Sequence, residues 1–180
     1  MTRLFLPAAA AALLLAIPAM AQDTTTTPPA AATTMTTAGD TPQAIIDQMS
    51  KVTAARDFVT FAAMSDRFEI DSGKLAEAQA DAKDVKQFAK KLVKDHTKSS
   101  KQLMDLVKKE KIDATAPAAL DQRHQAILDG LKVMKGKDFD TAFAQAQVQA
   151  HQEGIALFRS FSENGDNDQL KAFAKKGLPV

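Results

Sequence analysis

The chain has 180 residues, 23 basic and 22 acidic side chains, and no cysteine, tryptophan or tyrosine. A net charge of only +1 argues against a nucleic-acid-binding protein, which needs a surplus of Lys and Arg for phosphate contacts. The lack of cysteine excludes disulfides, thiol catalysis, iron–sulfur clusters and cysteine-rich zinc sites.

Residues 1–21 have the pattern of a signal peptide. Arg3 precedes the apolar stretch LPAAAAALLLAIPAM, which is short for a membrane span, and small residues at 19–21 suit a signal peptidase. We therefore expect export to the periplasm, with a mature chain that begins near Gln22. A retained amino-terminal anchor is the alternative, and no cysteine is present to carry a lipid.

Residues 22–42 are rich in Thr, Ala and Pro and carry only two charges. Such a segment buries too little apolar surface to offset the entropy of ordering it, so we predict a disordered linker. It would act as a spacer from a membrane or cell wall, or simply remain as a linker left by secretion.

From Pro42 onward, apolar residues recur every three or four positions, as one face of a helix requires. The pattern predicts a short helix within 41–52 and four longer helices over 54–79, 82–110, 119–135 and 138–164. A last short helix begins at a capping-box-like Asp166. We expect Asp81 to cap the second long helix and Gly136 to end the third in a left-handed conformation. The sequence therefore predicts an all-α domain over 43–180, an antiparallel four-helix bundle with short extra helices at both ends.

The second long helix is predicted to have two different faces. Phe88 belongs to its apolar stripe, and phenylalanines without Trp or Tyr favour buried aromatic packing. The opposite face carries six lysines at helical spacing, which we interpret as solvated surface: Lys83, Lys86, Lys90, Lys94, Lys98 and Lys101.

Four polar residues are predicted to lie near the middle of the bundle. Counting from the turns, Glu69 and His96 fall at nearly one height, and so do His124 and His151. Metal sites in helical bundles are built from side chains on facing helices, so these four could hold Zn, Fe, Cu or Mn. We favour a structural polar network without metal and expect no cofactor, and the metal site is the alternative.

No known catalytic motif is present: the sequence has no G-x-S-x-G, no Gly-rich phosphate loop and no H-E-x-x-H. Ser99 and Ser100 lie one turn from His96, but no oxyanion hole is evident. Asp140 is interpreted as a first-turn charge that favours the helix dipole. We expect a binding or structural module rather than an enzyme. Its partner would be an envelope protein or a small ligand, and peripheral membrane contact is a further alternative.

Three stretches carry a family resemblance: RDFVTFAAMSDRFEIDSGKLAEAQADAKDVKQFAKKLVKDHTKSSKQL, GKDFDTAFAQAQVQAHQEGIALF and LKAFAKKGLP. Together they resemble the bacterial domain of unknown function 4142, from about Arg56 to Pro179. The resemblance implies an exported, ferritin-like helical bundle of the cell envelope, often described as an outer membrane protein, with no established activity. A stress-related role in the envelope is the expectation.

The sequence departs from iron-binding ferritin-like proteins, which place a Glu three residues before a His on two helices. Val93 and Val148 stand at that spacing before His96 and His151, and only His124 has a carboxylate there, in Asp121. This argues against a di-iron centre. Members of the family also commonly continue past the LP with a helical stretch that contains a histidine, so we expect the bundle here to be incomplete or to rely on a partner.

Overall fold

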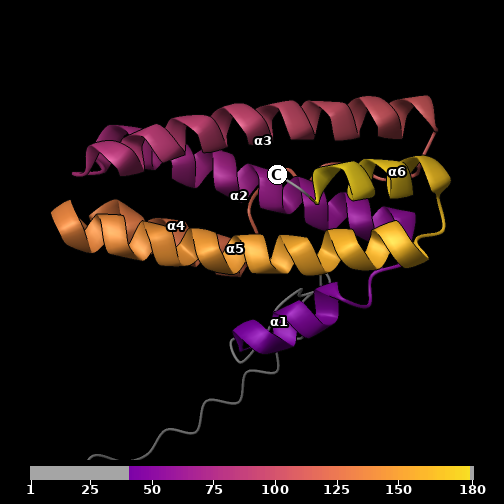
Figure 1. Ribbon diagram of the computed structural model, residues 1–180, viewed down its shortest axis with the longest axis horizontal. Coiled ribbons are helices and arrows are strands. Elements are labelled where there is room, and N and C mark those ends of the chain that lie inside the picture. The colour runs from indigo at the N-terminus through magenta and orange to yellow at the C-terminus, as the bar shows by residue number, and fades with distance from the viewer. Residues whose placement is uncertain (1–40, 179–180) are drawn as a thin grey trace, which may run out of the picture. The chain divides into compact units, whose positions relative to one another are not determined.

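The computed structural model describes residues 41–178, which form helices joined by loops and contain no strand (Figure 1). The predicted signal peptide over 1–21 and nearly all of the predicted linker over 22–42 lie outside this range. The all-α class is confirmed. The helices are α1 (Pro42–Met49), α2 (Ala55–Gln79), α3 (Lys83–Lys109), α4 (Gln122–Val133), α5 (Gly136–Asn164) and α6 (Asp168–Gly177).

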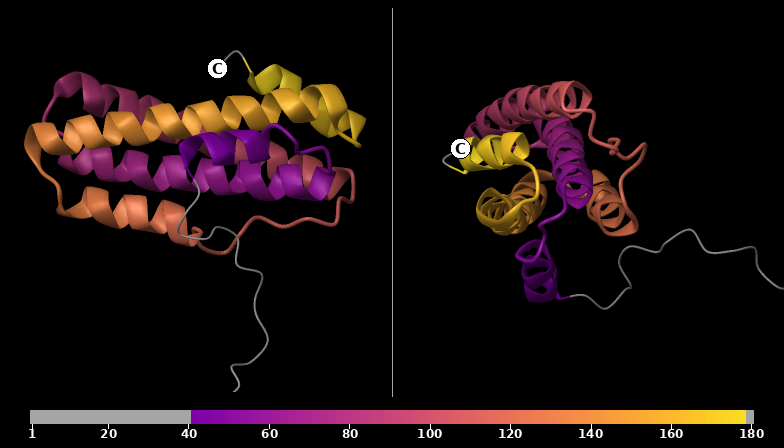
Figure 2. Two further views of the ribbon diagram at one scale, coloured as in Figure 1. Left: turned by 90° about the horizontal axis from the view of Figure 1, so that it is seen from below. Right: turned by 90° about the vertical axis from the view of Figure 1, so that its right-hand side faces the viewer.

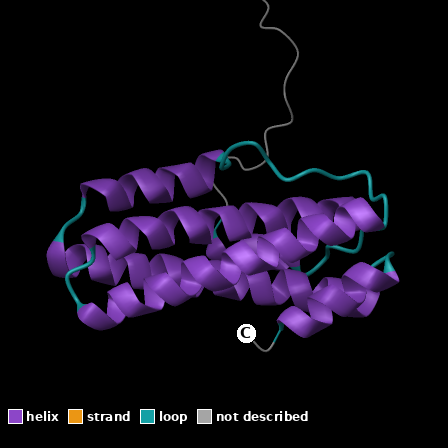
Figure 3. Cartoon of the chain, turned by 90° about the horizontal axis from the view of Figure 1, so that it is seen from above, coloured by secondary structure: helices purple, strands orange, loops and turns teal. Residues whose placement is uncertain are grey.

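Helix α2 lies at the centre of the arrangement, because it packs against α3, α4 and α5. The end-on view in Figure 2 shows these three helices around it. α3 follows α2 after a turn at 80–82, whereas a much longer loop leads from α3 to α4 (Figure 3). α1 and α6 both pack against α5. α2 therefore contacts both α3 and α5.

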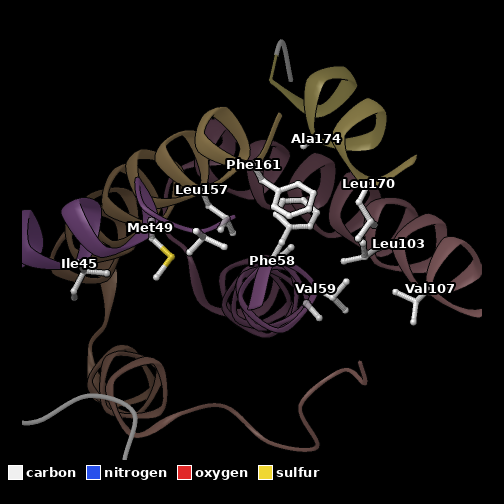
Figure 4. Packing of buried hydrophobic residues seen from close by; sticks show 13 residues of the cluster. Ile45, Met49, Phe58, Val59, Leu103, Val107, Leu157, Phe161, Leu170 and Ala174 are labelled. Atoms are coloured by element: carbon white, nitrogen blue, oxygen red, sulfur yellow. The ribbon is translucent and has the colours of Figure 1, made fainter. Parts of the chain in front are cut away.

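Buried apolar side chains form two clusters, one toward each end of α2. In the first, the rings of Phe58 and Phe161 stack with centroids 4.2 Å apart, among residues from α1, α2, α3, α5 and α6 (Figure 4). The second contains Phe139 and Phe143, with centroids 6.0 Å apart. Each buried ring stabilises the fold by about 2–3 kcal/mol. Phe88 is 44% exposed, so its predicted place on the buried stripe is wrong.

The amino terminus of α3 is capped from another helix. Asp140 of α5 accepts hydrogen bonds from the backbone N–H groups of Asp81 and Ala82, at 3.0 and 2.8 Å. The N-cap residue is Ala82, so the prediction that the Asp81 side chain caps this helix is wrong. Asp140 thus joins α5 to the start of α3, a role beyond the dipole effect predicted for it.

A similar contact fixes the start of α2. Asp166 accepts a hydrogen bond from the backbone N–H of Ala55 at 2.8 Å. The predicted role of Asp166 at the start of the last helix belongs instead to Asn167, whose side chain accepts from Leu170 N at 2.9 Å. Because short polar side chains cap whichever N–H groups lie near, their role depends on the tertiary structure.

Helix α4 is shorter than the predicted span 119–135. The Asp121 side chain accepts from His124 N at 2.8 Å and so sets the start of the helix at Gln122. Gly136 has the predicted left-handed conformation, with φ 58°, but it is the first residue of α5 and lies beyond the end of α4 at Val133.

The lysines predicted to face solvent on α3 are all exposed. Within residues 41–178, none of the helices is both long and apolar enough to cross a membrane.

Candidate metal centre

A layer of buried polar side chains separates the two apolar clusters at the middle of α2 and its neighbours. Burying such groups costs free energy unless they find partners. The layer comprises Asp66, Glu69 and Ser72 on α2, His124 on α4, and Gln147 and Glu153 on α5. Together with less buried neighbours, most of these residues form two groups with different pairing, and Gln147 donates to Ser72 at 3.0 Å outside both groups.

The first group, which we call the open cluster, consists of Asp66, Glu69, His96 and His151. His96 Nδ1 lies 2.8 Å from Asp66 Oδ1, and His96 Nε2 lies 3.5 Å from Glu69 Oε2. His151 Nδ1 lies 3.6 Å from the other Glu69 oxygen. One possible ligand atom from each of Glu69, His96 and His151 lies within 4.8 Å of the others. Three helices thus direct donor atoms to one point.

Glu69 is the most constrained member of the open cluster. Glu69 is 1% exposed, and its Oε2 atom is buried without a hydrogen-bond partner among the described residues. A buried carboxylate oxygen in this state is costly and calls for an explanation such as an ion. The His96 imidazole lies closest to this oxygen among the ion-pair contacts of Glu69, with Nε2 3.5 Å away.

Burial raises the pKa of Asp66, although the hydrogen bond and the charge of His96 act in the opposite direction. Burial also raises the pKa of Glu69, against the charges of His96 and His151. Burial alone would lower the pKa of His96, but the hydrogen bond to Asp66 and the charges of Glu69 and Asp66 outweigh it, and the pKa is raised. Among the described residues, the basic groups within ion-pair distance of these two carboxylates are the imidazoles of His96 and His151.

A close approach of α2 and α3 brings His96 to Glu69. A Cβ placed on Gly73 would lie 2.7 Å from Val93 Cγ2, so a side chain at Gly73 would force the two helices apart. Gly73 lies one turn after Glu69, and Val93 lies one turn before His96. The glycine thus permits the helix spacing on which the open cluster depends.

The second group, which we call the closed network, consists of Asp121, Arg123, His124 and Glu153. Arg123 pairs with both carboxylate oxygens of Glu153, at 3.1 and 2.6 Å, and its Nη2 lies 3.0 Å from His124 Nε2. His124 Nδ1 lies 2.7 Å from Asp121 Oδ2. Because arginine only donates, His124 Nε2 accepts here and Nδ1 donates to Asp121. Each member has its partners, and the network joins α4 to α5.

Of the four residues predicted as ligands, the structure brings Glu69, His96 and His151 together and places His124 in the closed network. His124 lies at the predicted height, since its ring contacts Phe68 with centroids 4.8 Å apart, but on another side of α2 from His96. Asp66 was missed. Its position three residues before Glu69, on the same helical face, was the available signal.

Comparisons with known proteins agree with the resemblance seen in the sequence. No curated protein and no solved structure matches the chain. The family model described as Domain of unknown function (DUF4142) matches residues 25–180, which is most of the chain. The chain therefore belongs to the DUF4142 family.

Proposed function

We propose that the folded part of this protein binds one transition-metal ion through Glu69, His96 and His151. The observation that carries the proposal is the buried, unpaired Oε2 of Glu69, held 3.5 Å from an imidazole nitrogen. A metal ion would satisfy this oxygen and neutralise the remaining charge of the open cluster.

The distances support coordination better than simple ion pairing. Two ligand atoms that each lie about 2.1 Å from a tetrahedral metal are about 3.4 Å apart. The separation of 3.5 Å between Glu69 Oε2 and His96 Nε2 is close to this value. The ligand atoms of the trio lie up to 4.8 Å apart. Two ligands on opposite sides of one metal are about 4.2 Å apart at most, so the widest pair must move closer when the metal binds. We expect the His151 ring, which is 40% exposed, to move by this small amount when metal binds.

Hydrogen bonds outside the trio orient the two imidazoles. Asp66 accepts from His96 Nδ1, which leaves Nε2 with its lone pair toward Glu69. The Gln147 carbonyl lies 2.9 Å from His151 Nδ1, so donation there leaves Nε2 of His151 as the ligand atom. Such partners typically fix the tautomer of a metal-binding histidine and raise its basicity.

Two imidazoles and one carboxylate suit Zn, Fe, Cu or Mn and leave at least one coordination position free. The His96 side chain is 22% exposed, so the position is accessible from solvent between α3 and α5. We further propose that α2–α5 form an antiparallel, ferritin-like bundle, in which a mid-bundle metal site is expected. One glutamate supports a mononuclear site and gives no second carboxylate ligand for a di-iron centre.

We also propose that the protein is exported and acts as a metal-binding module of the bacterial envelope, possessing no enzymatic role of its own. The signal-peptide pattern of residues 1–21 supports this, as does the family resemblance. Cell fractionation with mass analysis of the processed chain tests it: cleavage near Gln22 and a periplasmic or outer-membrane location are expected. An unprocessed chain in the cytoplasm would overturn it.

The metal proposal is tested by elemental analysis and by titrating the purified protein with Zn, Fe, Cu and Mn, followed by calorimetry and thermal melting. We expect about one equivalent of one metal and a higher melting temperature. His96→Ala should lower the affinity at least about 100-fold, because one of three ligands is lost. His124→Ala is the matched control, since it removes a histidine of the closed network, and it should leave the affinity unchanged.

Less than about a tenth of an equivalent of any metal, with unchanged melting, would mean that the open cluster is only a structural polar network. Equal loss of affinity in the two histidine variants would place the metal elsewhere.

A further inference from the structure

Helix α3 carries an unusual concentration of positive charge on one side. Its 27 residues include nine lysines, all exposed. At 3.6 residues per turn they fall within a sector of about 140°, which we call the lysine sector. Its lysines are Lys83, Lys86, Lys90, Lys91, Lys94, Lys98, Lys101, Lys108 and Lys109.

The charge of α3 is opposite to that of the remaining described chain. α3 has nine lysines and three aspartates, a net charge of +6. The other residues within 41–178 have 13 basic and 17 acidic side chains, a net charge of −4. A protein that is nearly neutral as a whole therefore presents one strongly basic side, and α3 extends this side over about 40 Å at 1.5 Å per residue.

Most of the lysine sector is not used for internal ion pairs. Lys91 pairs with Asp95, Lys101 with Asp105, and Lys109 with Glu110. No ion pair with a described residue involves the other six lysines. The buried side of α3, with Ala89, Leu92, Leu103 and Val107, holds the helix against the core, so the lysine sector faces away from it.

We propose that the lysine sector docks this protein on an anionic lipid surface, with the lysines at the level of the headgroup phosphates. Clusters of four to eight basic residues on one helical face are attracted to such surfaces. A helix with basic side chains along its length can lie flat on a plane, and two surface pockets beside Phe61 include no residue of α3.

The composition of the sector favours a lipid surface over a nucleic acid. The other exposed residues within it are Gln87, Thr97 and Asp105, so no aromatic side chain is available for base stacking. Lysines act as point charges, whereas specific base contacts more often use the planar fork of arginine. No exposed apolar side chain lies in the sector, which predicts attachment without insertion and release by salt.

The test is co-sedimentation of the full chain with vesicles of phosphatidylcholine alone or mixed with anionic phosphatidylglycerol. A triple variant neutralises the centre of the sector, Lys86→Gln, Lys90→Gln and Lys94→Gln. A matched control removes the same charge from exposed lysines elsewhere, Lys51→Gln, Lys74→Gln and Lys137→Gln. Circular dichroism checks that both fold. The unchanged protein and both triple variants share residues 1–40, so any vesicle binding by that segment is the same in all three.

We expect binding to the anionic vesicles that is lost at about 0.5 M salt. The sector variant should bind about 100-fold more weakly, at roughly fivefold per lysine, whereas the control should change less than about fivefold. Four results would overturn the proposal: no binding at low salt, equal binding to both vesicle types, equal loss in both variants, or tighter binding to duplex DNA than to anionic vesicles at the same salt. None of these outcomes depends on whether a metal occupies the open cluster.

Discussion

The open cluster and the closed network lie in the same polar layer, and each contains a histidine whose Nδ1 contacts an aspartate, at 2.8 Å for His96 and 2.7 Å for His124. They differ in their source of positive charge. Arg123 binds both oxygens of Glu153, whereas Glu69 has only imidazoles beside it and keeps one oxygen unpaired. The closed network contains the permanent cation of Arg123 and joins α4 to α5, whereas the basic groups of the open cluster are imidazoles, which is why we propose a metal ion there.

The largest expected difference between the two regions is in the stability of the metal-free protein. Glu153→Gln should lower the free energy of unfolding by about 3 kcal/mol, because Arg123 is then left mostly buried without a counter-charge. Glu69→Gln is the matched change in the open cluster and should leave stability unchanged or raise it, since it removes a buried charge that has no cation. Urea unfolding measures both.

Equal destabilisation by the two glutamine substitutions would contradict this contrast. It would mean that Glu69 is already stabilised by partners within the fold and is not reserved for an ion.

The next largest effect concerns the two aspartates that contact histidines. Asp66→Asn should weaken metal binding roughly 10- to 100-fold, because the carboxylate orients His96 and raises its basicity. Asp121→Asn makes the same chemical change next to His124 and should leave metal affinity unchanged. Titration calorimetry with the metal that elemental analysis identifies compares the two. A loss of affinity in Asp121→Asn as large as in Asp66→Asn would show that the two regions are coupled.

A smaller effect is predicted for pH, with opposite sign in the two regions. The pKa values of Asp66, Glu69 and His96 are raised above their usual 3.8, 4.5 and 6.5, so the folded state holds protons that the unfolded chain releases. Each of these three groups contributes its full stabilisation when the pH is below its usual pKa. The stabilisation is lost as the pH rises through its raised pKa in the folded protein. For Asp121, burial is outweighed by hydrogen bonds from His124, and the pKa is lowered. The contribution of Asp121 to stability is present above pH 3.8, its usual pKa, and is lost as the pH falls through the lowered pKa.

Melting temperatures of the metal-free protein between about pH 5 and pH 8 test this prediction. They should fall as pH rises, and the double variant Asp66→Asn, Glu69→Gln should show a flatter profile. Added metal should stabilise most at the high end of the range, because the ligands are then deprotonated. A metal-free melting temperature that rises with pH across this range would show that the open cluster does not hold these protons.

The sequence predicted the helices well, since their positions follow from apolar residues at helical spacing. The predicted spans 54–79 and 82–110 differ little from α2 and α3 as observed. The errors concern helix ends and orientation. Asp140 and Asp166 cap helices that are distant in sequence, and Phe88 is exposed although its spacing matches the buried stripe. Capping depends on which N–H groups lie near in space, and that is not visible in local sequence.

The candidate site could be predicted in part for the same reason. Counting residues from the turns gives the height of a side chain along a helix, and this was enough to group Glu69 with His96. It does not give the direction in which each helix faces its neighbours. His124 lies at the right height but faces Arg123 and Asp121, and Asp66 was not recognised as the partner of His96.

By itself, the sequence determined that this protein is all-helical, that its lysines follow one face of α3, and that polar residues meet at the middle of its helices. These features follow from helical periodicity, which is local. Only the tertiary structure decided which polar residues meet, because rotation of each helix about its axis is set by packing, including the close contact of Gly73 with Val93. That packing leaves Glu69 Oε2 buried without a hydrogen-bond partner beside His96 and brings Arg123 to Glu153 in the closed network.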